Sequence, residues 1–180
     1  WHLRGVLRAM TINPLVSVII PAYNAQAYLS QALDSVCSQT YPYLEILLWD
    51  DGSTDGTKSI IQEYAARDAR IRLVEGQRTG HPGRARNQLM KVANGEYFAF
   101  LDCDDLWVKN KLEMQLKAVS ESQTWSLCYT GNCEFPGLVP PQSLYSPPSL
   151  EECKSNFANE LIAGPEGFER LFLSQTGIAT

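Results

Sequence analysis

The chain has 180 residues, of which 44% are hydrophobic and 19% charged, as in a globular domain with an apolar core, and this composition excludes intrinsic disorder. Its formal net charge is −5, which argues against a general nucleic-acid-binding protein. The whole excess of acidic over basic residues lies after residue 120, so the earlier part can still hold a local basic cluster for an anionic ligand. The five cysteines are widely spaced without a Cys-x-x-Cys pair, which argues against a disulfide framework or structural zinc and for a reducing compartment.

Residues 1–14 are expected to form an N-terminal extension that is neither a signal peptide nor a membrane span, because arginines interrupt its apolar residues. No later stretch is long and apolar enough to cross a bilayer. The β-branched run at 15–20, which Pro21 closes, predicts a first buried strand.

The turn after this strand contains Ala22, Tyr23 and Asn24. Asn24 is predicted to be the N-cap of a helix over about 26–38, whose apolar residues recur at helical spacing. Tyr23 lies at a strand-to-helix junction, where ligands bind in open α/β sheets. It could stack on a base or simply cover the sheet edge, and its position alone favours neither.

A second strand is predicted over 44–49, and it again ends in acids, so two strands deliver carboxylates to the same edge of the sheet. Asp51 could accept a hydrogen bond from a base or ribose. Ser53, Thr54 or Asp55 is expected to cap a helix over about 55–67. A third, shorter strand near an edge is predicted over 70–74.

A glycine-rich, basic loop spans 75–86 and includes Arg84 and Arg86. Glycines let the backbone approach a ligand, and guanidinium groups match phosphate oxygens, although solvated surface charge is the more usual explanation of such a run. The next helix is predicted over about 84–94, ending at a C-cap formed by Asn94 and Gly95.

The apolar run at 97–101 predicts a buried parallel strand that ends in Asp102, Asp104 and Asp105. Three carboxylates in four positions raise one another's pKa unless a cation or a set of donors compensates. A divalent cation such as Mg²⁺ or Mn²⁺, shared with a bound diphosphate, is the simplest solution. For a lone motif of this kind, an acidic turn that caps the next helix is an equally good explanation.

The rest of the chain carries weaker signals. A helix is predicted over 109–120 and a strand over 125–130, so that the main domain covers about 15–130. Residues 131–180 are expected to form a proline-rich connection and the start of an acceptor-side region, with helices over 149–163 and 166–173 and with the chain cut short at its end.

Six blocks of the sequence, in order, resemble the signatures of family 2 glycosyltransferases with the GT-A fold. They lie at residues 16–24, 35–41, 50–55, 85–87, 93–97 and 101–105. The resemblance covers about 15–120 and implies an α/β GT-A fold, a Rossmann-like three-layer sandwich around a mostly parallel sheet.

The resemblance also implies an inverting transferase that uses a nucleotide-diphosphate sugar and Mn²⁺ or Mg²⁺. A UDP-sugar is the expected donor, although base and sugar stay open. The implied nucleotide-binding residues lie in three parts of the sequence: Pro21, Ala22, Tyr23 and Asn24 after the first strand; Asp51, Arg84 and Arg86 in the following turns; and Asp102, Cys103 and Asp104 in the acidic turn. Asp104 and Asp105 are the implied metal ligands.

No acidic motif after the metal-binding acids matches the family's general base, which is therefore expected beyond Thr180. The resemblance therefore implies that this chain holds the donor half of an enzyme of polysaccharide biosynthesis and lacks part of the acceptor half. The expected acceptor is a saccharide or a lipid-linked sugar, and the expected location is the cytoplasm or the inner membrane face. Two alternatives stay open. One is a nucleotide-binding module without transferase activity. The other is a metal-dependent phosphohydrolase, which gives no role to Tyr23 or Asp51.

Overall fold

The computed structural model describes residues 13–120 and 128. The chain divides into two compact units, 1–109 and 110–180, and each is described by itself. The described part of the second unit contains the helix α4 (Lys111–Ser120) and Cys128. All the elements discussed below belong to the first unit. The strand predicted over 125–130, apart from Cys128, and the helices predicted over 149–163 and 166–173 lie outside the described residues.

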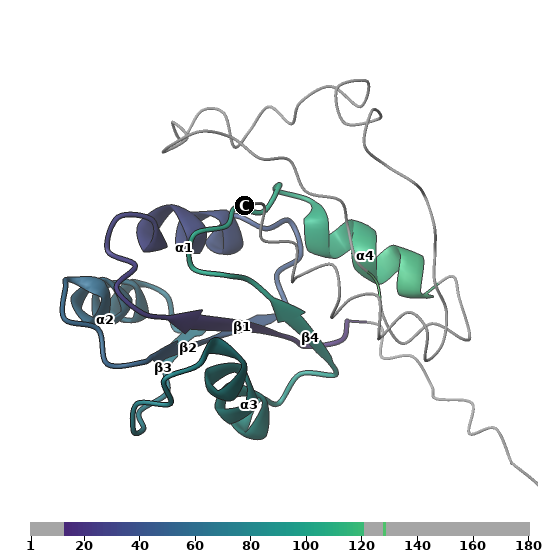
Figure 1. Ribbon diagram of the computed structural model, residues 1–180. Helices are drawn as coiled ribbons and strands as arrows, with labels where there is room; N and C mark the ends of the chain where they lie inside the picture. The colour runs from purple at the N-terminus through teal and green to yellow at the C-terminus, as the bar shows by residue number, and fades with distance from the viewer. Residues whose placement is uncertain (1–12, 121–127, 129–180) are drawn as a thin grey trace, which may run out of the picture. The chain divides into compact units, whose positions relative to one another are not determined.

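The first unit is built around a four-stranded sheet in the order β3-β2-β1-β4, with every pair of neighbours parallel. Its strands are β1 (Val16–Ala22), β2 (Leu44–Asp50), β3 (Ile71–Leu73) and β4 (Tyr97–Phe100). All seven residues of β1 are buried, as their β-branched run predicted. The helices α1 (Leu29–Cys37) and α2 (Thr57–Arg67) lie on one face, and α3 (Pro82–Val92) lies on the other (Figure 1). The predicted three-layer α/β architecture is confirmed.

The core on the α3 side joins alternate residues of two strands to one helix. Ile19 of β1 and Leu47 and Trp49 of β2 pack with Ala85 and Leu89 of α3, and all five are at most 5% exposed. Because strand side chains alternate between faces, the intervening residues Ile20 and Leu48 are directed to the opposite face. This packing fixes α3 against the two central strands and thereby sets the position of its first turn.

β4 is less buried than its sequence predicted. Phe98 and Phe100 are each 46% exposed, and they alternate with less exposed residues. In the described part of the chain β4 is the last strand of the sheet and pairs only with β1. An apolar run is buried on both faces only where helices cover both, so the expectation of a fully buried strand was wrong for these residues.

Three predicted helix caps were also wrong. The N-cap of α1 is Tyr28, without a side-chain hydrogen bond, and Asn24 lies before it in the left-handed region at φ 49°. The N-cap of α2 is Gly56, although the Asp55 carboxylate does accept from the backbone N–H of Thr57 at 3.0 Å. α3 ends at Val92, so Asn94 and Gly95 do not form its C-cap.

Gly95 is instead required by a close approach at the amino ends of β1 and β4. A Cβ atom on Gly95 would lie 2.5 Å from Ser17 Oγ and 2.6 Å from the Ser17 nitrogen. The Gly95 N–H donates both to Ser17 Oγ and to the Glu45 carboxylate, which also accepts from Ser17 Oγ and from the Asn94 backbone. Burial alone would raise the pKa of Glu45, but these hydrogen bonds outweigh it and lower the pKa below its usual value.

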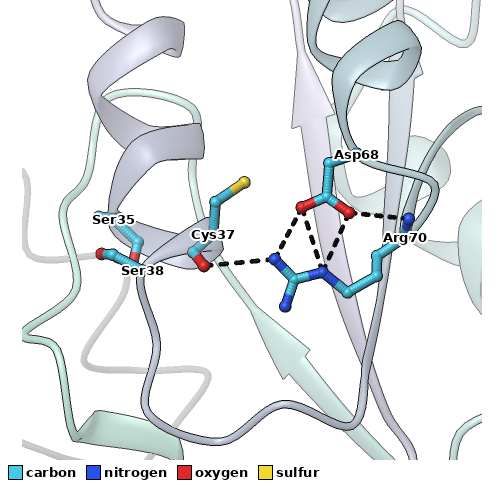
Figure 2. Close-up of polar contacts among 5 residues, drawn as sticks. All are labelled: Ser35, Cys37, Ser38, Asp68 and Arg70. Atoms are coloured by element: carbon cyan, nitrogen blue, oxygen red, sulfur yellow. Dashed lines mark hydrogen bonds and ion pairs between the residues drawn. The ribbon is translucent and has the colours of Figure 1, made fainter.

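The carboxyl ends of α1 and α2 are tied together at the start of β3. Arg70 donates from Nε and Nη2 to the Asp68 carboxylate, and from Nη2 to the backbone carbonyl of Cys37 at 3.3 Å (Figure 2). The hydrogen bond from Arg70 is the main reason why the pKa of Asp68 is lowered. Burial, and then the charge of Asp68, raises the pKa of the Cys37 thiol to about 11, so this thiol is not a reactive nucleophile at neutral pH.

Candidate functional site

The sheet brings the predicted site residues of β1, β2 and β4 to one edge. Ala22 and Asp50 lie opposite each other in register, and the Asp51 N–H donates to the Ala22 carbonyl at 2.8 Å. Tyr23 and Asp51 therefore follow neighbouring strand ends. On the other side of β1, the Leu101 N–H donates to the Ile19 carbonyl at 3.2 Å, so the acidic turn begins beside the end of β1. This carboxyl edge is where parallel sheets bind ligands.

Asp51 anchors the glycine-rich loop. Its side chain is 7% exposed and accepts from Trp49 Nε1 at 3.2 Å, and from the backbone N–H groups of Thr79 and Gly80 at 2.5 and 2.8 Å. Burial alone would raise the pKa of Asp51, but these donors lower it. Both carboxylate oxygens are thus engaged by the protein, and a base or ribose would use only the remaining lone pairs.

Two glycines allow the loop to take this path. A Cβ on Gly76 would lie 2.0 Å from the Trp49 indole, so only glycine fits against that ring. Gly80 has φ +70°, a conformation that favours glycine. The loop then enters α3, where the His81 side chain caps the helix by accepting from the Gly83 N–H at 3.0 Å.

The loop places Arg78 over Tyr23. The guanidinium carbon lies 4.9 Å from the centroid of the Tyr23 ring, and the stem of Arg78 lies next to Gly52, which has φ +81°. The sequence contained this arginine in a basic loop but gave no sign that it would meet the aromatic residue after β1. Trp49 and Thr79, which fix the loop through Asp51, were missed for the same reason, because these contacts are formed only in the folded chain.

Asn24, predicted as a nucleotide-binding residue, holds the turn after β1 to the turn after β2. Its Oδ1 accepts from the Thr54 N–H at 2.8 Å, and its backbone N–H donates to Ser53 Oγ at 2.9 Å. Its left-handed conformation is one that asparagine tolerates. Pro21 and Ala22, also predicted as nucleotide-binding residues, are buried and form the carboxyl end of β1.

The acidic turn after β4 is tied to α3 by an ion pair between Arg86 Nη2 and Asp102 Oδ1. Arg86 Nε is buried without a hydrogen-bond partner in the described part of the chain, so it keeps one donor for a ligand. Beyond the turn, the Trp107 N–H donates to Ser35 Oγ of α1 at 3.2 Å. The acidic turn is therefore fixed at both ends.

The carboxylates of this turn affect one another. Burial of the carboxyl group, followed by the charges of Asp102 and Asp104, raises the pKa of Asp105, although the residue as a whole is exposed. Burial and then the charge of Asp104 raise the pKa of the Cys103 thiol, while a hydrogen bond involving the Tyr23 backbone acts in the opposite direction. Cys103 thus lies beside the Tyr23 backbone, which links the acidic turn to the end of β1.

Arg84 and Arg86 lie on different sides of the start of α3. Whereas Arg86 meets Asp102, Arg84 lines a surface hollow of about 580 Å³ with Arg78, Gln88 and Lys91. The sequence did not distinguish the roles of the two arginines. In the structure they have different surroundings, since Arg86 pairs with a carboxylate and Arg84 lines the hollow.

The acidic turn has the chemistry that a divalent cation needs. Within residues 13–120 and 128, no three His, Cys, Asp or Glu side chains gather into a ready-made metal cage. A cation that is completed by the oxygens of a diphosphate needs only one or two carboxylates. Burial is the first cause of the raised pKa of Asp105, and the charges of Asp102 and Asp104 are the second. A divalent cation would offset this second effect, and carboxylates are the ligands it prefers, so these residues fit the group.

Residues 17–162 match the model of a family described as "Glycosyl transferase family 2". A similar curated protein is the putative teichuronic acid biosynthesis glycosyltransferase TuaG of Bacillus subtilis, 44% identical over 119 residues that cover 66% of this chain and 47% of TuaG. Another is UDP-Glc:alpha-D-GlcNAc-diphosphoundecaprenol beta-1,3-glucosyltransferase WfgD of Escherichia coli, 41% identical, with 67% of this chain and 46% of WfgD covered. The chain spans less than half the length of these relatives.

A similar solved structure is mannosyltransferase PcManGT from Pyrobaculum calidifontis in complex with GDP-Man and Mn²⁺. It is 32% identical with a TM-score of 0.56, and the match covers 63% of this chain and 34% of that one. The similarity confirms the predicted GT-A fold. In the described ranges 13–120 and 128, none of the helices has the length and apolar character required to span a bilayer.

Proposed function

Because the chain belongs to glycosyl transferase family 2, we propose that it binds a nucleoside-diphosphate sugar and takes part in transferring the sugar to an acceptor hydroxyl with inversion. The observation that carries this proposal is the meeting of Tyr23, Asp51 and the Arg86–Asp102 pair at one edge of the sheet. An aromatic platform, a guanidinium and several carboxylates are the groups that a base, a diphosphate and its metal require. Family membership favours an enzyme over a nucleotide-binding module without activity.

In this proposal the residues of the first strand end hold the base. Tyr23 stacks on it, and the backbone of Pro21 and Ala22 lines its pocket. Asp51 accepts from the base while it fixes the loop at Thr79 and Gly80. Asn24 supports the pocket by joining its two turns.

The diphosphate lies, in this proposal, between the start of α3 and the acidic turn. Arg86 donates to phosphate oxygens from its Nε, which has no hydrogen-bond partner among the described residues, and Arg84 adds positive charge from the other side of the start of α3. Asp102 and Cys103 lie beside the ribose, and Asp104 and Asp105 hold Mn²⁺ or Mg²⁺. When bound, the cation neutralises negative charge on the departing diphosphate.

The donor and acceptor are proposed from the relatives' names. WfgD is named for a UDP-Glc donor and a diphosphoundecaprenol-linked acceptor, and TuaG for teichuronic acid biosynthesis. We therefore propose a UDP-sugar donor, a saccharide or lipid-linked acceptor in polysaccharide biosynthesis, and action in the cytoplasm or at the inner membrane face. Because the similar structure PcManGT is in complex with GDP-Man, a GDP-sugar is the second candidate donor.

Calorimetric titration with UDP, with and without Mn²⁺, tests the proposal. The wild-type chain is expected to bind UDP more tightly with Mn²⁺, and Asp104→Ala is expected to lose about tenfold or more of that affinity, because a charged ligand to the cation is removed. Glu63→Ala, which removes an exposed carboxylate of α2, is the matched control and should bind like the wild type. If the affinity for UDP is the same with and without Mn²⁺, and the same in Asp104→Ala as in the wild type, the assignment is contradicted.

A further inference from the structure

Arg78 lies over the ring of Tyr23, the same ring on which the base stacks in the proposed function. Its guanidinium carbon lies 4.9 Å from the centroid of Tyr23, within the range of a cation–π contact, and the Tyr23 residue is 47% exposed. A guanidinium and a nucleobase are both flat groups that stack on a phenol ring. One face of Tyr23 therefore holds either Arg78 or the base.

The backbone that carries Arg78 is fixed, while its side chain has room to turn. Asp51 holds the next two residues by accepting from the N–H groups of Thr79 and Gly80. Gly52 leaves space for the stem, since a Cβ there would lie 3.3 Å from Arg78 Cδ. The long flexible stem can thus redirect the charged group without moving the loop.

The charge of Arg78 is not neutralised within the described region. No carboxylate of residues 13–120 forms an ion pair with it. The hollow that it lines also contains Arg84 and Lys91, and no acidic residue. A guanidinium in such surroundings gains from binding phosphate oxygens, which match its paired N–H groups.

We infer that Arg78 is a further donor-binding residue, one that exchanges partners when the donor binds: the base takes the face of Tyr23, and the guanidinium moves to the diphosphate oxygens. This inference rests on the proposed function. A residue that only packed against Tyr23 would support the ring without affecting the phosphates. In the proposed exchange, Arg78 instead competes with the base for Tyr23 and binds the phosphates once the base is in place.

The two roles give effects of opposite sign on two ligands. Arg78→Ala is expected to weaken UDP binding, measured calorimetrically with Mn²⁺, by about tenfold or more, because charge-assisted hydrogen bonds are lost. The same variant is expected to tighten the binding of uridine, measured by NMR titration, by about two- to fivefold, because the competing cation–π contact is removed. Arg67→Ala removes an exposed arginine of α2 and should change neither value.

Two further variants sharpen the result. Arg78→Lys keeps the charge and should retain more UDP affinity than Arg78→Ala. In a Tyr23→Leu background, Arg78→Ala should leave uridine binding unchanged, because no shared ring remains. If Arg78→Ala weakens UDP and uridine alike, or changes neither, the exchange is overturned while the proposed function stands. If the wild-type chain binds no nucleoside diphosphate, the proposed function fails, and this inference fails with it.

Discussion

Asp51 is a buried carboxylate whose three donors come from the strand just before it, β2, and from two loop residues, the first of which lies 28 residues further along the chain. It links the end of β2 to the segment that carries Arg78, so its first effect is on the shape of the site. The sequence predicted that Asp51 lies at the carboxyl edge of the sheet, because it follows an apolar strand. It did not predict the loop contacts, since a local pattern contains no information about which distant backbone donors a carboxylate will meet.

Asp51→Asn should therefore destabilise the fold as well as the site. An amide has one acceptor oxygen where the carboxylate offers two, so at least one of the donors loses its partner, at a cost of about 1–3 kcal/mol. Urea unfolding at pH 7 measures this as a lower midpoint. Asp104→Asn, at an exposed carboxylate, should leave the midpoint unchanged, and an equal shift in both variants would contradict the anchoring role.

At the scale of elements, the parallel strands and their helices followed from apolar runs and helical spacing, whereas the helix ends did not. Asn24 was predicted to be a cap because asparagine often caps helices. Its side chain instead accepts from the Thr54 N–H, and its own N–H donates to Ser53 Oγ, so both groups bond to the turn after β2 and not to α1. Gly95 looked like a C-cap, but it is fixed by its approach to Ser17. In both cases a contact with a distant element overrides the local preference.

The Glu45 network ties β2 to β1 and to the segment before β4, and it is tested by pH. Glu45→Gln should lower the free energy of unfolding by about 1–2 kcal/mol at pH 7, because hydrogen bonds to a charged acceptor are replaced by neutral ones. Since folding lowers the pKa of Glu45, its stabilisation is complete above the unfolded-state pKa and is lost as the pH falls through the folded-state pKa.

The difference between wild type and Glu45→Gln should accordingly be constant from pH 6 to 8 and shrink toward pH 3, as measured by urea unfolding at each pH. Glu63→Gln, in an exposed pair with Arg67, should stay within about 0.5 kcal/mol of the wild type. A Glu45→Gln difference that is the same at pH 3 and pH 7 would show that the carboxylate charge does not matter.

For the molecule as a whole, the central claim is that separate elements build one donor site at the carboxyl edge of the sheet. The fold made this convergence predictable, because the ends of neighbouring parallel strands meet at one edge. The Arg86–Asp102 pair, which joins α3 to the turn after β4, was not predictable, because it depends on how α3 packs on Ile19 and Leu47.

The most direct test is a crystal structure of the chain grown with UDP and Mn²⁺, with the anomalous signal of the metal recorded. We expect the uracil ring against Tyr23, the diphosphate within hydrogen-bonding distance of Arg86, and the manganese peak at Asp104 and Asp105. Nucleotide density at any other surface, or a manganese peak away from the acidic turn, would contradict the account.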